Sequence, residues 1–291
     1  MWEPLGTLKK IYLVIVAVLC GFAIRLMCQQ VHIPEVPGYQ GVILSSGHSV
    51  RNMTCIFFAL ATCTFFSTIV TRRVRFEAGL YCASLGLGFL AVRAGSMGVL
   101  LRTSDGKPVF PLAVAELFLL FCMLQFCWQF LHLLHAKGWL LSEPKNVNLE
   151  LANTSMHRVI ALLVHVSITA GIIAILARTD SLKQVVLGVF IASLSGSVIS
   201  HQSFPVRPSC WLWPGAMLVG LAGYIWAMFQ HTDLSAGAIP NPLARPSPLV
   251  YASVGTAGAI LGYWVSRQWH EAEEDSVLNA DLLEENDKPV E

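Results

Sequence analysis

Residues 110–136 read FPLAVAELFLLFCMLQFCWQFLHLLHA, an apolar run with one acidic side chain, Glu116. At about 1.5 Å per residue, an α-helix over this run is about 40 Å long, which exceeds the ~30 Å hydrocarbon core of a bilayer. Backbone amides in lipid must be paired within the segment that carries them. We therefore expect a membrane-spanning helix that is tilted or protrudes from the bilayer.

The rest of the chain repeats this pattern, with long apolar runs separated by short polar connectors. Of the 291 residues, 55% are hydrophobic and 13% are charged, against about 25% charged residues in a soluble domain. The sequence predicts an all-α, polytopic integral membrane protein in which residues 1–267 form a bundle of about eight transmembrane helices. The expected spans are 11–28, 53–71, 78–101, 110–136, 157–177, 184–200, 209–230 and 248–267.

Lys and Arg residues predict the orientation of the bundle. They concentrate on the connectors of one side, among them Lys9, Lys10, Arg72, Arg73 and Lys137. Because cytoplasmic connectors carry the excess of these residues, we expect a multi-pass protein of the cell membrane with both termini in the cytoplasm.

The segment 268–291 differs in composition from the bundle, since it is short of apolar residues and rich in Asp and Glu. Such a run is typical of a solvated, disordered tail, and we expect one on the cytoplasmic side. The alternative is that residues 271–291 bind a cytoplasmic protein through an apolar helical edge.

Small residues at helical spacing are expected to bring the helices into close contact, because lipid supplies no hydrophobic drive between them. Three spans carry such stripes. They are Gly79, Ala83 and Gly86; Ser193, Gly196, Ser197 and Ser200; and Gly255, Ala259, Gly262 and Ser266.

Charged residues within spans are costly and mark candidate functional positions. Arg25 lies one turn from the end of its span and can reach the interface. Arg93 and Glu116 lie deeper, on consecutive spans joined by a short connector, so we expect them to form a buried ion pair. A structural pair is favoured over a proton path, because no further acids continue from it.

Gln125, Gln129 and His132 share one face of the fourth span, and this polar stripe is expected to face other helices or water. Three histidines, His132, His157 and His201, map to the cytoplasmic ends of consecutive spans. Imidazoles can ligate haem or transition metals, so these three residues form a candidate metal site. Hydrogen-bonded interfacial histidines are the simpler interpretation.

No P-loop, dinucleotide-binding motif or nucleophile elbow occurs in the chain, which favours a non-enzymatic protein. The net charge of +1 gives no indication of a nucleic-acid partner. The first hypothesis is a membrane-complex subunit, scaffold or small permease that contacts the bilayer and other membrane subunits. The alternative is a membrane oxidoreductase or metal- or haem-handling protein that uses the three histidines. The two halves of the chain show no convincing repeat, which weakens the permease hypothesis.

Overall fold

The computed structural model is all-helical over the residues it describes, with no strand among them. These residues are 7–30, 42–45, 48–72, 74–75, 77–93, 97–103, 108–138, 155–179, 181–206, 209–230, 239 and 241–270. Within them, seven helices are long and apolar enough to cross a membrane, and Ala78–Arg93 is a shorter apolar helix. The protein is therefore a helical membrane bundle of about eight helices, as the apolar runs predict.

Most helices begin and end within a few residues of the predicted spans. They are α1 (Thr7–Met27), α2 (Ser49–Thr71), α5 (Val109–Ala136), α6 (Ser155–Leu176), α7 (Leu182–Ser203) and α8 (Gly215–Phe229). Within the predicted span 78–101, the described helices are α3 (Ala78–Arg93) and the short α4 (Met97–Thr103). The acidic tail, residues 271–291, lies outside the described residues.

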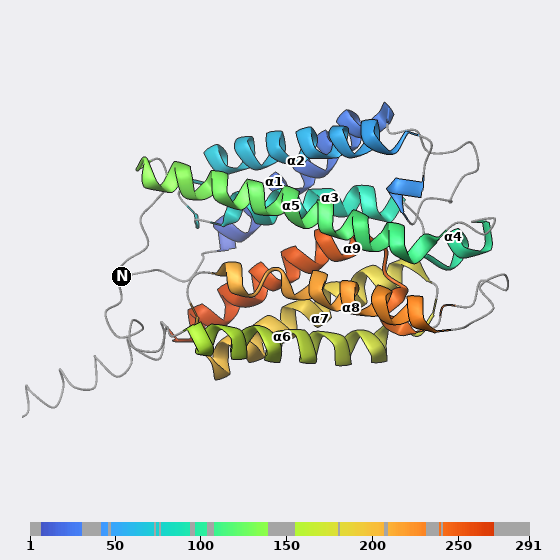
Figure 1. Cartoon of the computed structure of the whole chain (residues 1–291). Helices are drawn as coiled ribbons and strands as arrows, with labels where there is room; N and C mark the ends of the chain where they lie inside the picture. Colours follow the sequence, from blue (N-terminus) through green and yellow to red (C-terminus); the bar gives the residue numbers. More distant parts are fainter. Residues whose placement is uncertain are drawn as a thin grey trace, which may run out of the picture.

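The last span, Pro248–His270, is the central element of the bundle. In its most apolar window 89% of the residues are buried, against 22–56% in the other six long spans. It consists of α9 (Pro248–Val250), the π-helical segment η7 (Tyr251–Gly255) and an α-helix over residues 256–270. Figure 1 shows α1, α2, α3 and α5 on one side of it and α6, α7 and α8 on the other.

Glycines account for the close packing of the helices, as the small-residue stripes predict. A Cβ atom on Gly262 would collide with the Leu194 carbonyl oxygen of α7, and one on Gly86 would lie 2.9 Å from the Cys20 carbonyl carbon of α1. Ser193 of α7 adds a hydrogen bond, because its Oγ donates to the Gly255 carbonyl oxygen at 2.7 Å. The stripes are therefore helix–helix contact surfaces.

Short 3₁₀ segments fill the ends of the bundle. They are η1 (Cys28–Gln30), η2 (Ile43–Ser45), η4 (Ser209–Trp211) and η6 (Pro242–Ala244). The Tyr251 hydroxyl fixes η6 to the last span by donating to the Leu243 carbonyl oxygen at 2.8 Å. Irregular backbone at membrane depth requires such internal partners, because lipid offers none.

The bundle has two ends that differ in chemistry. Arg25 and Arg93, in the last turns of α1 and α3, lie at one end, which we call the Arg93 end. Glu77, just before α3, and Trp264, near the end of the last span, lie at the other, which we call the Glu77 end. The interface between α3 and the last span connects the two ends.

Candidate functional site

A hollow of about 610 Å³ opens at the Arg93 end, between the two groups of helices. The α1–α3 side contributes Arg25, Leu85, Gly88, Phe89, Val92 and Arg93, and the other side contributes Val186 of α7 and Val254 of η7. Its volume falls within the ~300–1,000 Å³ typical of small-molecule sites. The hollow therefore combines mostly apolar walls with two cationic side chains.

Both arginines of the hollow are available for a ligand. Their side chains are exposed, and within the described part of the chain neither guanidinium has a hydrogen bond or an ion pair. Each stands at the C-terminus of its helix, where the helix dipole favours a cation.

The expected ion pair between Arg93 and Glu116 is not formed between these two described residues. Arg93 is the last described residue of α3, and its side chain is exposed. Glu116 of α5 is fully buried and faces a different neighbour: its Oε2 accepts a hydrogen bond from the Leu44 amide of η2 at 3.0 Å. The carboxylate thus fixes η2 to α5, and its Oε1 has no hydrogen-bond partner among the described residues.

The Glu77 end is closed by buried polar groups. The Trp264 indole Nε1 donates to Glu77 Oε2 at 2.9 Å, which joins the α2–α3 connector to the last span. The Arg75 guanidinium lies 5.8 Å from the centre of the same indole ring, and the Tyr81 ring packs against it at 5.1 Å. Arg75, Glu77 and Trp264 are each at most 4% exposed. These polar side chains are thus buried, whereas Arg25 and Arg93 at the other end are exposed.

His201 of α7 extends this polar closure. Its Nδ1 lies 2.8 Å from Ser266 Oγ of the last span, and its ring packs edge-on against Tyr263 at 4.9 Å. Gln202 also reaches the last span, since its Nε2 donates to the Ser266 carbonyl oxygen at 3.5 Å. The Glu77 end thus holds α7, the last span and the α2–α3 connector together.

The three candidate metal ligands do not converge. His132 packs against Trp128 of its own helix, His157 of α6 packs against Phe204, and His201 contacts the last span as described above. No three His, Cys, Asp or Glu side chains of the described chain are placed to hold a metal ion. The predicted cluster is corrected accordingly: equal depth in the membrane did not mean proximity, because the side chains point to different neighbours.

The predicted polar stripe of α5 is only partly covered by protein. Gln125 and His132 are half-buried, whereas Gln129 is exposed on the surface of the bundle. The stripe was expected to face other helices or water, and Gln125 and His132 meet the first of these, whereas Gln129 lies on the outer surface of the bundle.

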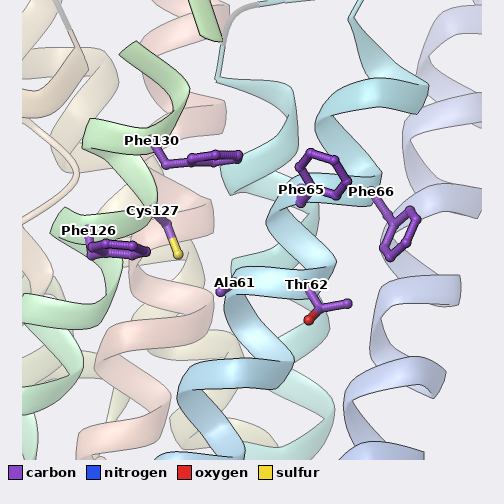
Figure 2. Close-up of a pocket in the computed structure, with 7 residues that line it drawn as sticks. All are labelled: Ala61, Thr62, Phe65, Phe66, Phe126, Cys127 and Phe130. Carbon is purple, nitrogen blue, oxygen red and sulfur yellow. The ribbon is translucent and has the colours of Figure 1, made fainter. Parts of the chain in front are cut away.

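A second, apolar groove of about 330 Å³ runs between α2 and α5 on the surface. Figure 2 shows its lining residues, Ala61, Thr62, Phe65 and Phe66 from α2 and Phe126, Cys127 and Phe130 from α5. The Phe65 and Phe130 rings meet across it with their centres 5.9 Å apart. Its chemistry is that of lipid tails or of an apolar helix.

Sequence reasoning missed Glu77 and Trp264 as partners. Glu77 stands one residue before the predicted span 78–101 and reads as part of a polar connector. The available signal was the position of Glu77 directly at a span end, two residues after Arg75. An acidic side chain that is buried there needs a polar partner, whereas one in a solvated connector does not. Comparison with protein-family models, with curated proteins and with solved structures finds no match to this chain.

Proposed function

We propose that the protein is a small permease, in which the two groups of helices alternately open one end of their interface and close the other. The observation that supports this is the asymmetry of one interface. Between α3 and the last span, the Arg93 end carries a hollow and the Glu77 end is sealed by buried charges. A ligand site at the interface between two groups of helices is an arrangement that alternating access uses.

The polar side chains that close the Glu77 end, here called the seal, support a contact that can open. Burying Glu77 and Arg75 costs free energy unless both find polar partners, and a purely structural contact is made more cheaply by apolar side chains. A polar seal can exchange its partners for water when the end opens. An apolar seal would lose its hydrophobic contacts without replacement.

The backbone of the last span provides a second support. Its π-helical segment, Tyr251–Gly255, forms part of the hollow through Val254. Such segments are rare and occur frequently at functional sites. The central and most buried helix is thus irregular beside the hollow.

A subunit of a membrane complex is the second candidate function, and the groove between α2 and α5 favours it. This surface is lined by four phenylalanines and can receive an apolar helix of another chain. The oxidoreductase hypothesis is not retained, because it depended on convergence of His132, His157 and His201.

Labelling of introduced cysteines tests the permease proposal. Val92→Cys places a thiol in the hollow, and Ala78→Cys places one in the sealed end, where Ala78 is fully buried. Reaction with a membrane-impermeant maleimide is measured by peptide mass spectrometry in opened membranes, with Arg178→Cys, at an exposed position after α6, as reference. We expect the thiol at position 92 to react and the thiol at position 78 to remain unmodified.

A seal-breaking substitution then tests whether the two ends are coupled. In a permease, Glu77→Gln removes the charge that holds the seal, so labelling at position 78 should rise about tenfold and labelling at position 92 should fall. A rise at position 78 with no change at position 92 would mean that the two ends are independent. That outcome, or no change in labelling at either position, would overturn the permease proposal and leave the proposal of a membrane-complex subunit.

A further inference from the structure

We propose that the hollow at the Arg93 end binds an anionic amphiphile: its phosphate or carboxylate headgroup lies between Arg25 and Arg93, and its hydrocarbon chain lies along the apolar walls. This inference deepens the proposed permease function by naming its ligand class, and it rests on the same site. The first support is charge. Two guanidinium groups from different helices line one hollow, and no described acidic residue lines it.

Arginine is suited to this ligand because its planar fork presents paired N–H donors to phosphate or carboxylate oxygens. Snorkelling alone would explain an arginine at a helix end that meets lipid headgroups anywhere on the surface. It does not explain why Arg25 of α1 and Arg93 of α3 border the same space of about 610 Å³. The coincidence of two cations with a hollow therefore indicates a site of defined stoichiometry.

The walls give the second support, since they match a hydrocarbon chain. Leu85 and Val92 from α3 face Val186 from α7 and Val254 from η7 across the hollow. Burying methylene groups against such side chains is favourable because it removes apolar surface from water. A small polar anion would leave these walls in contact with water, so the apolar lining favours a ligand that carries a chain.

Binding to the purified full-length protein in a nonionic detergent tests the proposal. The probes are phosphatidylglycerol, phosphatidylcholine with the same chains, and inorganic phosphate, each measured by native mass spectrometry. We expect one saturable phosphatidylglycerol per protein, with phosphatidylcholine bound at least tenfold more weakly. Inorganic phosphate that binds as tightly as the lipid would overturn the amphiphile and indicate a free-anion site.

Substitutions separate the headgroup from the chain. Arg25→Gln and Arg93→Gln should each weaken phosphatidylglycerol binding about tenfold, and Arg178→Gln, an exposed arginine outside the hollow, should leave it unchanged. Val92→Trp fills the hollow and should abolish binding while Arg25 and Arg93 remain. Equal loss with Arg178→Gln, or full binding with Val92→Trp, would show headgroup adsorption at the membrane surface and contradict the site.

The Glu77→Gln variant keeps this test distinct from that of the permease. If the permease proposal is correct, opening the Glu77 end closes the hollow, and phosphatidylglycerol binding weakens. If binding is unchanged in Glu77→Gln but still depends on Arg25 and Arg93, the ligand class is supported and the permease is overturned. Loss of the arginine dependence overturns the ligand class whatever Glu77→Gln does.

Discussion

Replacing Trp264 with Phe should destabilise the bundle by removing one buried hydrogen-bond donor. Trp264 is 3% exposed, and its Nε1 donates to the carboxylate of Glu77 at 2.9 Å. A hydrogen bond to a charged group contributes about 1.5–3 kcal/mol, and its loss leaves a buried carboxylate oxygen with one donor fewer. At about 2–4 °C per kcal/mol, the lower figure predicts a fall of about 3–6 °C in the melting temperature of the purified protein.

The assay is thermal unfolding followed by tryptophan fluorescence, with Trp269→Phe as the matched control. Trp269 lies on the same helix and is 56% exposed, so its replacement should change the melting temperature by less than about 1 °C. A double-mutant cycle with Glu77→Ala separates the hydrogen bond from lost ring volume, and we expect a coupling free energy of about 1.5 kcal/mol. A melting temperature of Trp264→Phe no lower than that of Trp269→Phe would refute the role of this hydrogen bond. So would free energies of unfolding of the Trp264→Phe and Glu77→Ala variants that add within about 0.5 kcal/mol.

Two further predictions test the packing of the helices and the attachment of η2 to α5. Gly262→Leu should prevent folding, seen as loss of the monodisperse peak in size-exclusion chromatography, because its Cβ collides with the Leu194 carbonyl oxygen. Gly171→Leu, whose Cβ meets open space, should fold normally, and equal yields of the two variants would contradict the close approach. Glu116→Gln keeps an acceptor for the Leu44 amide whereas Glu116→Ala removes it, so hydrogen exchange of that amide should quicken about tenfold only in the alanine variant. Similar exchange in both variants would show that the carboxylate does not hold η2.

The helical spans were predictable because hydropathy is a property of consecutive residues. A run such as 110–136 must be helical in lipid whatever surrounds it, and α5 covers Val109–Ala136. The third span was predicted as one run to Leu101, within which α3 covers Ala78–Arg93 and α4 begins at Met97. Length and composition alone place no boundary inside such a run.

Pairings between helices were harder to predict because they depend on rotation about each helix axis. Arg93 and Glu116 were matched by depth, yet Glu116 faces η2, a segment that reads as an ordinary connector in the sequence. His157 and His201 were matched in the same way and contact different partners. The prediction of close packing from the small-residue stripes was confirmed, because it concerns only which face of a helix is in contact and does not depend on a particular partner.

Distances between spin labels on the two groups of helices test the central claim, that one interface opens at one end and closes at the other. One pair is placed at the exposed positions Val92 and Leu187, at the Arg93 end, and a second at the exposed positions Arg72, which follows α2, and Ile199 of α7, at the Glu77 end. In lipid nanodiscs, Glu77→Gln should shorten the first distance and lengthen the second by several ångströms, about the scale of helix shifts in switching proteins. Unchanged distances in both pairs would contradict alternating access and describe a rigid bundle.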